Sequence, residues 1–173
     1  MTEKQEKIIQ AALQLFAQEG YNATSTSKVA KHAGVSEGLI FRHFKNKEGL
    51  LQAILNFGAD KLKEIIVDIV LEADPEKVIR KAIELPASVD KSEYDFWKLQ
   101  YKLKWELEIN HDEKMEPLHM ALSNAFRKLN YKSPDLEASL IVLYIDGIAS
   151  SMLKASNLDA ESLIQFLCEK YKV

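Results

Sequence analysis

The sequence contains very little cysteine, and this limits both its chemistry and its expected compartment. Cys168 is the single cysteine among 173 residues. One thiol can build neither a disulfide framework nor a cysteine-rich zinc site, so a reducing cytoplasm is the expected location. Because Cys168 follows the apolar segment 163–167, we interpret it as a small core residue. A redox sensor is the alternative.

Long apolar runs and strand-like patterns are also missing. No uninterrupted apolar stretch reaches about 18 residues, so we expect no membrane-spanning segment. Residues 2–7 are rich in charge and no apolar secretory segment follows them, so we expect no signal peptide. With 47% apolar and 28% charged residues, the composition is that of a globular protein. The alternation of apolar and polar residues that marks exposed strands does not occur, and we expect no sheet.

Glycine and proline are sparse, and their positions divide the chain into helices. Gly20 is suited to the end of a helix and Gly34 to a tight turn between two helices. Pro117 is expected in the first turn of its helix, after a break at residues 110–112. Capping residues ahead of helically spaced apolar side chains predict helix starts at Thr2, Ser25, Ser36, Asn46, Asp74, Ser133 and Asp159.

These signals predict an all-α fold in two parts. Three short helices form residues 1–46, a helical body forms residues 47–173, and a long helix over 47–72 links them. The net charge of −3 argues against nucleic acid, but the charge is unevenly distributed. Residues 1–50 hold seven Lys and Arg against five Asp and Glu, whereas the remainder holds 16 against 21. The local field at the N-terminal part is therefore mildly positive, and local charge matters more for DNA than the total does.

The segment 134–156 is predicted to be an unusually apolar helix. Between residues 136 and 153 its only charged residues are Glu137 and Asp146. A helix that is apolar on all sides must be buried on all sides. One chain of this size covers one face, so we expect a second copy to cover the other; a central core helix of a monomer is the alternative. The expected homodimer interface contains Leu140, Tyr144, Gly147, Ile148, Ser151 and Phe166.

The short helix that begins after Ser36 has an outer face suited to a DNA groove. At helical spacing Ile40 and Phe44 point inward, whereas Gly38 and Arg42 point outward. A guanidinium on such a face can bind a guanine edge through two hydrogen bonds, and side chains at two helix starts can contact phosphate. A solvated face with ordinary charges is the alternative. The candidate DNA-binding residues are Ser25, Thr26, Ser36, Glu37, Gly38, Leu39, Phe41, Arg42, His43, Lys45 and Lys47.

Several segments of the first 55 residues together resemble the TetR family of bacterial repressors. They are Gly20-Tyr21-Asn22-Ala23-Thr24-Ser25, Val29-Ala30, Ala33-Gly34-Val35-Ser36-Glu37-Gly38 and Phe41-Arg42-His43-Phe44-Lys45-Asn46-Lys47-Glu48-Gly49-Leu50. The resemblance implies an all-helical homodimer with an N-terminal DNA-binding domain and a C-terminal ligand-binding and dimerisation domain. It also implies phosphate contacts at Ser25, Phe41, His43 and Lys47, and base contacts within 36–42. Two positions depart from the family pattern, which has tyrosine at Phe41 and an apolar residue at Thr26.

A dimer of this kind presents two copies of the reading helix, about 34–36 Å apart, to successive major grooves. We expect a small molecule bound among the body helices to tilt the helix over 47–72 and so change this spacing. The expected ligand-binding residues are an aromatic stripe and its neighbours, for which ordinary core packing is the alternative. They are Tyr94, Trp97, Tyr101, Trp105, Met120 and Phe126.

The sequence thus predicts a ligand-responsive DNA-binding regulator, acting as a repressor on a palindromic double-stranded operator. No cofactor, metal or catalytic residue is expected. The best enzymatic alternative is a carboxylate metal site at Glu116-x-x-His119, but such bundles need two of these motifs and this chain has one. A helical adaptor that binds protein partners is the other alternative, and it leaves residues 36–47 without a role.

Overall fold

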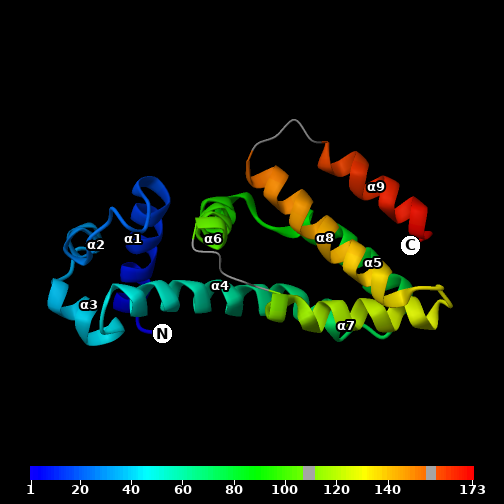
Figure 1. The fold of residues 1–173 in the computed structure, drawn as a ribbon, viewed down its shortest axis with the longest axis horizontal. Helices are drawn as coiled ribbons and strands as arrows, with labels where there is room; N and C mark the ends of the chain where they lie inside the picture. Colours follow the sequence, from blue (N-terminus) through cyan, green and yellow to red (C-terminus); the bar gives the residue numbers. More distant parts are fainter. Residues whose placement is uncertain (107–111, 155–158) are drawn as a thin grey trace. The chain divides into compact units, whose positions relative to one another are not determined.

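The structure is a computed structural model that describes residues 1–106, 112–154 and 159–173, without the side chains of residues 104, 105, 112 and 113. In these residues the chain is helical and contains no strand (Figure 1), as the sequence predicts. The elements are α1 (Glu3–Glu19), α2 (Thr26–Ala33), α3 (Glu37–Phe44), α4 (Lys47–Val70), α5 (Pro75–Glu84), η1 (Leu85–Ser88), η2 (Lys91–Glu93), α6 (Tyr94–Glu106), α7 (Asp112–Lys128), α8 (Pro134–Leu153) and α9 (Ala160–Tyr171).

The helices form two compact units. Unit 1 consists of Met1–Lys61 and Asp95–Ile109, and unit 2 consists of Leu62–Tyr94 and Asn110–Val173. This division differs from the sequence-based boundary after residue 46, because the first part of α4 and most of α6 pack with the N-terminal helices. The side chains that join them to the core of α1 are Leu50, Ile54, Leu55, Leu99 and Leu103.

Unit 1 begins with a well-capped α1. Thr2 and Gln5 form the predicted capping box, in which each side chain accepts the other's backbone N–H, at 3.3 and 2.8 Å. The buried face of α1 centres on Phe16, which is fully buried. Gly20 ends the helix at φ 92°, a conformation that side chains disfavour. The buried hydroxyl of Thr24 donates to the Gly20 carbonyl at 2.9 Å and fixes the loop toward α2.

Within unit 1, α4 and α6 pack closely at a glycine. Gln100 of α6 is 6% exposed and donates from Nε2 to the carbonyl of Ile54 in α4 at 3.2 Å. A Cβ at Gly58, one turn further along α4, would lie 2.6 Å from Cδ of Gln100. The missing side chain at residue 58 is therefore what allows the Gln100 amide to reach the α4 backbone. The rings of Phe57 and Phe96 pack edge to face beside this contact, with centroids 5.7 Å apart.

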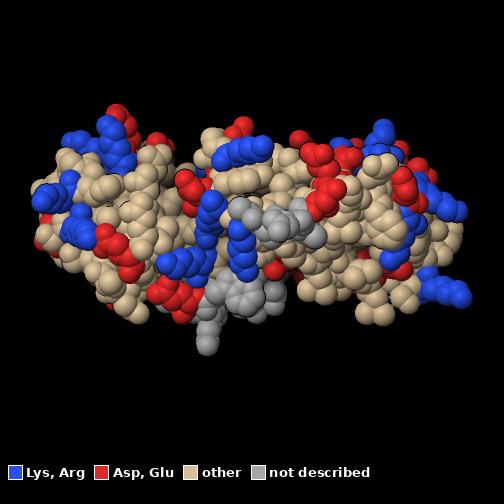
Figure 2. All heavy atoms as spheres, turned by 90° about the horizontal axis from the view of Figure 1, so that it is seen from above, with Lys and Arg blue, Asp and Glu red and all other residues tan. Residues whose placement is uncertain are grey.

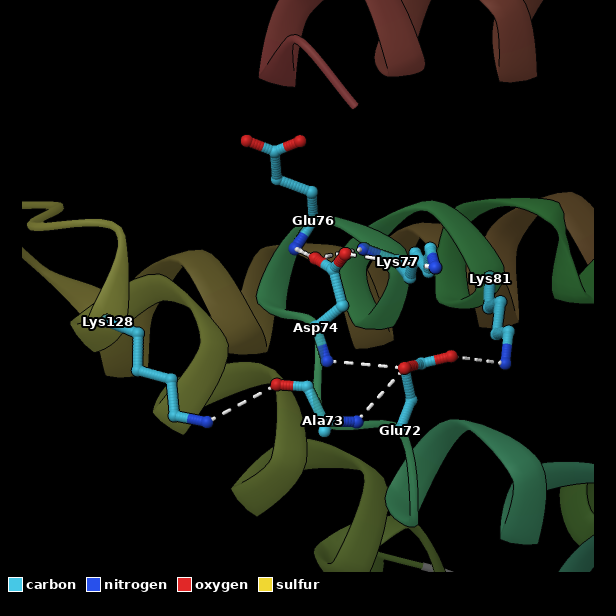
Figure 3. A network of polar contacts seen from close by, with 7 residues as sticks. All are labelled: Glu72, Ala73, Asp74, Glu76, Lys77, Lys81 and Lys128. Atoms are coloured by element: carbon cyan, nitrogen blue, oxygen red, sulfur yellow. Dashed lines mark hydrogen bonds and ion pairs between the residues drawn. The ribbon is translucent and has the colours of Figure 1, made fainter.

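In unit 2 the turn between α4 and α5 is held by a polar network (Figure 3). Oε1 of Glu72 accepts the N–H groups of Ala73 and Asp74 at 3.0 and 3.2 Å, and Oε2 accepts from Nζ of Lys81 at 2.8 Å. These bonds, that of Lys81 first among them, lower the pKa of Glu72 to about 2. Asp74 caps α5 with its side chain ahead of Pro75, which confirms the predicted helix start.

The core of unit 2 ends on an aromatic cluster that secures the C-terminal helix. Phe126 of α7 is fully buried, and its ring centroid lies 4.9 Å from that of Tyr131 and 5.4 Å from that of Tyr171. The hydroxyl of Tyr171 donates to Oε2 of Glu137 at 2.8 Å. Burial, and then this acceptor, raise the pKa of Tyr171. The cluster therefore joins α7, α8 and α9.

Two local predictions need correction. Pro117 lies inside α7 and not in its first turn, because the helix begins earlier, at Asp112. Ser36 occupies the N-cap of α3 but forms no side-chain cap hydrogen bond, so its hydroxyl leaves the first-turn N–H groups uncapped. The predicted break at 110–112 falls largely outside the described residues. The predicted side-chain caps at Ser25 and Asp159 are confirmed.

The helix α8 is the unusually apolar helix that the sequence predicts. Among the described residues, α8 is long and apolar enough to cross a membrane by length and composition, although the core helix of a water-soluble protein meets the same criterion. Glu137 and Asp146 are too few to lower its mean hydropathy below that level. Only 28% of its most apolar window is buried inside the chain, so much of this helix faces outward from unit 2.

Candidate nucleic-acid interface and effector residues

The candidate nucleic-acid interface is built on the turn between α2 and α3. Gly34 has the left-handed conformation, with φ 67° and ψ 34°, and its N–H bonds back to the end of α2. Ile40 is fully buried and Phe44 is 8% exposed, so these two side chains anchor α3 to unit 1. Gly38 and Arg42 are exposed, as their helical spacing predicts. The guanidinium therefore stands on the outer face of a firmly anchored helix.

The residues beside Arg42 add an apolar border to this face. The ring of Phe41 is 46% exposed, which is high for an aromatic side chain. Leu39 and His43 are half-buried on the flanks of α3. Without a phenolic hydroxyl, Phe41 has no hydrogen bond to offer a phosphate, and its contribution is limited to packing against a sugar or a base methyl.

The lysine at the start of α4 has a defined position. Nζ of Lys47 lies 4.4 Å from the ring centroid of Tyr21 and donates to the carbonyl of Asn22 at 3.4 Å. The side chain of Asn46 caps the same helix end, accepting the N–H of Gly49 at 2.7 Å. Free N–H groups and an ammonium ion at one helix N-terminus together favour a phosphate. Tyr21 and Asn22 thus hold Lys47 near the site where the sequence places a phosphate contact.

Two other predicted DNA contacts bond to each other. The hydroxyl of Thr26, at the start of α2, donates to Oε1 of Glu37, at the start of α3, at 2.6 Å. Ser25 precedes this pair and is exposed, although its Oγ accepts the N–H of Lys28 as a helix cap. The hydroxyl of Ser36 caps nothing. The hydroxyl of Ser25 is thus engaged as a helix cap and that of Thr26 with Glu37, whereas that of Ser36 is engaged in neither way.

The charges around this surface are mixed. Figure 2 shows basic and acidic side chains interspersed over the face that it presents. On unit 1, Lys28 forms an ion pair with Glu19 at 2.6 Å, so its charge is partly compensated. Lys45 is exposed at the C-cap of α3, with φ 68°. The structure therefore favours a few well-placed cations, and not a broad basic surface, as the source of any DNA affinity.

The predicted ligand-binding residues do not lie in one compact unit. Trp97 and Tyr101 belong to unit 1, whereas Tyr94, Met120 and Phe126 belong to unit 2. The side chain of Trp105 lies outside the described residues. Met120 is 56% exposed, and packing within the aromatic cluster accounts for the complete burial of Phe126.

Trp97 has one property that packing does not explain. Its Nε1 is buried and has no hydrogen-bond partner among the described residues. The indole ring lies edge to face against Phe96, with centroids 5.1 Å apart, so the ring position is well defined. A buried N–H group without an acceptor is costly unless a ligand or water supplies one. Trp97 is therefore the strongest of the predicted effector residues.

The predicted dimer residues divide by exposure. Leu140 and Phe166 are 48% and 58% exposed, and Gly147 is also exposed, so all three are available to a partner. Ile148 is only 3% exposed, because its own chain covers it. Tyr144 is half-buried, its hydroxyl has no partner among the described residues, and burial raises its pKa to about 12. Ser151 is half-buried as well.

Sequence reasoning missed several residues that shape these sites. Leu136 and Leu143 are 71% and 70% exposed and lie on the same side of α8 as Leu140. The helical spacing 136, 140, 143 was a usable signal. Nothing in the sequence indicated that the ring of Tyr21 would lie under the ammonium group of Lys47, or that Gln100 would bond to the backbone of α4. Both contacts join residues that are distant in the chain.

Comparison with known proteins places the N-terminal segment in a family. Residues 8–54 match the profile described as bacterial regulatory proteins, tetR family. The HTH-type transcriptional regulator YuxN of Bacillus subtilis, itself uncharacterized, is 38% identical over 103 residues, which make up 59% of this chain and 35% of that protein. The match thus spans about a third of the length of that relative.

Solved structures extend the similarity over the whole chain. Salmonella enterica GusR has a TM-score of 0.72 at 21% identity, covering 100% of this chain and 99% of that chain. AibR, solved in complex with isovaleryl coenzyme A and operator DNA, has a TM-score of 0.70 at 20% identity, covering 95% of this chain and 96% of that chain. At such identity these matches show a shared fold. The match of residues 8–54 identifies the N-terminal segment of this chain as that of the TetR family of bacterial regulatory proteins.

Proposed function

We propose that the protein is a ligand-responsive transcriptional regulator, and specifically a cytoplasmic repressor that binds a palindromic operator as a homodimer. One observation carries this proposal: α3 is anchored by Ile40 and Phe44 and exposes Arg42 on the opposite side. An anchored, exposed guanidinium can read guanine through O6 and N7. A protein-binding adaptor would not require α3 to be anchored with Arg42 exposed on its outer side.

The residues around Arg42 divide into two roles. Base readout belongs to Arg42, with Gly38 allowing close approach of the helix and Leu39 in reach of a thymine methyl. Phosphate positioning belongs to residues at helix ends, where N–H groups are free. The proposed phosphate and sugar contacts are Ser25, Ser36, Phe41, His43, Lys45 and Lys47.

A second copy of the chain is the proposed partner of α8. Leu136, Leu140, Leu143 and Gly147 follow one another at spacings of four, three and four residues, and all four are exposed. Such a stripe is the side of a helix that another helix covers. We call these four residues the α8 stripe. The exposed ring of Phe166 on α9 supplies further apolar surface for the same contact.

The proposed effector is a small molecule with a hydrogen-bond acceptor for Trp97. The supporting observation is the buried indole N–H without a partner among the described residues. Tyr94, Tyr101, Trp105, Met120 and Phe126 are proposed as further contacts. Effector binding changes DNA affinity to the extent that it favours one arrangement of the reading heads over another.

Selection of bound duplexes from a random DNA pool tests the function directly. The expected result is a palindrome whose two halves are about one helical turn apart, with a guanine in each half that depends on Arg42. Binding should weaken steeply as salt rises, because phosphate contacts release counterions. Recovery of no enriched sequence, together with salt-independent or absent duplex binding, would favour the adaptor alternative.

A further inference from the structure

The bond between Thr26 and Glu37 occupies a special place in the helix-turn-helix. Each residue is the first of its helix, and the donor and acceptor oxygens lie 2.6 Å apart in a partly buried position. Among the described residues, this is the only side-chain hydrogen bond that joins α2 to α3. The buried residues that the two helices contribute to the core, Val29, Ala30, Ile40 and Phe44, are apolar. Apolar burial is non-directional, whereas a hydrogen bond depends on its angle.

The position of Glu37 on its helix argues against a base contact. Glu37 precedes Ile40 by three residues and Phe44 by seven, so it lies toward the buried side of α3. Arg42 lies on the other side and is exposed. The half-buried carboxylate is thus turned toward α2 and away from the surface that Arg42 presents.

The carboxylate of Glu37 is the acceptor in this hydrogen bond. A hydroxyl donor to an ionised acceptor makes a strong hydrogen bond. The carboxylate also lies at the N-termini of two helices, where the aligned peptide dipoles favour a negative charge. The bond therefore favours one mutual orientation of the two helices.

We propose that Thr26 and Glu37 form a brace that fixes the angle of α3 to α2 and thereby determines how strongly the protein prefers its operator to other DNA. Both are positioning residues that act through Arg42, and neither contacts a base. This inference rests on the proposed function. In this proposal Thr26 acts as half of the brace and does not contact phosphate.

The test measures dissociation constants of the full-length protein for two duplexes at fixed salt. One duplex is the operator recovered by selection, and the other is a scrambled duplex of equal length and composition. Thr26→Val removes the hydroxyl and keeps the shape, whereas Thr26→Ser restores a donor. Glu37→Ala removes the acceptor, whereas Glu37→Gln keeps an acceptor oxygen without the charge. Circular dichroism confirms that each variant is folded.

We expect Thr26→Val to weaken operator binding about 3- to 10-fold, the equivalent of one hydrogen bond, with scrambled-duplex binding unchanged. Thr26→Ser should behave like the unmodified protein. Glu37→Gln should tighten binding to both duplexes equally and preserve their ratio, whereas Glu37→Ala should lower the ratio. In the double variant of Thr26→Val and Glu37→Ala, the preference for the operator over the scrambled duplex should fall no further than in either single variant.

Three results would overturn the brace. An unchanged ratio in Thr26→Val would show that the bond does not control discrimination, and equal weakening on both duplexes would mark Thr26 as a phosphate contact. Equal loss in Glu37→Gln and Glu37→Ala would mark the carboxylate as a base reader. If Thr26→Val does not fold, the comparison of the two Glu37 variants decides. Failure of the unmodified protein to prefer any duplex would instead refute the proposed function.

Discussion

Gly58→Ala is expected to destabilise unit 1, although alanine is the better helix former. The substitution gains about 1 kcal/mol of helix propensity. Against this, the new Cβ would lie 2.6 Å from Cδ of Gln100 and 2.8 Å from both of its terminal atoms. Ordinary contacts between such atoms need about 3.5–4.0 Å. The buried amide must therefore move by roughly 1 Å and give up its bond to Ile54.

The expected sum is unfavourable. Overpacking typically costs about 1–3 kcal/mol, and stranding a buried amide costs a further 1–3 kcal/mol or so. Because Gln100 is a flexible side chain, relaxation reduces the first cost, and we expect a net loss of about 1–3 kcal/mol in the free energy of unfolding. In a Gln100→Ala background the methyl meets no amide, and Gly58→Ala should become neutral or stabilising by up to about 1 kcal/mol.

Urea unfolding followed by tryptophan fluorescence is the appropriate assay, at one fixed protein concentration. Both tryptophans of the chain, Trp97 and Trp105, belong to α6, so the signal reports on the helix that carries Gln100. Gly38→Ala is the matched control, since a Cβ there meets nothing within 4 Å. If Gly58→Ala stabilised the protein as Gly38→Ala does, or if its effect were the same with and without Gln100, the proposed close packing would be refuted.

Three further predictions concern the interface, the dimer and the α4–α5 turn. Arg42→Ala should weaken operator binding by about 1–3 kcal/mol and relax the preference at one base position, as measured by anisotropy titration; equal loss on scrambled DNA would contradict its role as a reader. Leu143→Glu should shift the protein to monomer in sedimentation equilibrium without unfolding it, since Leu143 is 70% exposed, whereas Val67→Glu, at another exposed position, should remain dimeric. A monomeric unmodified protein would refute the dimer. The pKa of Glu72 is lowered to about 2 from 4.5, so its contribution to stability is complete above pH 4.5 and is lost as the pH falls toward 2. Glu72→Gln should therefore flatten the stability profile in that window; an unchanged slope would show that the bond to Lys81 does not form.

Much of the fold could be predicted because helix signals are local. Capping residues such as Thr2, Asp74 and Asp159 act within a few positions of themselves, and each capped the helix that the sequence assigned to it. The same holds for the outer face of α3, where the spacing of Ile40 and Phe44 determines the exposure of Arg42. These features depend on periodicity and short-range hydrogen bonding, which the sequence displays directly.

What could not be predicted depends on contacts between distant segments. The compact units differ from the boundary after residue 46, because Leu99 and Leu103, some fifty residues beyond α4's first turns, complete the core of unit 1. The role of Gly58 depends on Gln100 in the same way. Thr26 departs from the family pattern, and only the structure revealed its acceptor on Glu37.

In the proposed dimer, the α8 stripe would connect the abundance of the protein to its activity. Each subunit of that dimer would carry one reading helix, so a single subunit would make only half of the contacts of the proposed palindrome. When pairing of subunits and operator binding are linked, mass action makes occupancy rise with roughly the square of the subunit concentration wherever monomers predominate. A promoter under this regulator would then respond to the number of copies in the cell as sharply as to the effector, and a modest change in synthesis or turnover would act as a second input.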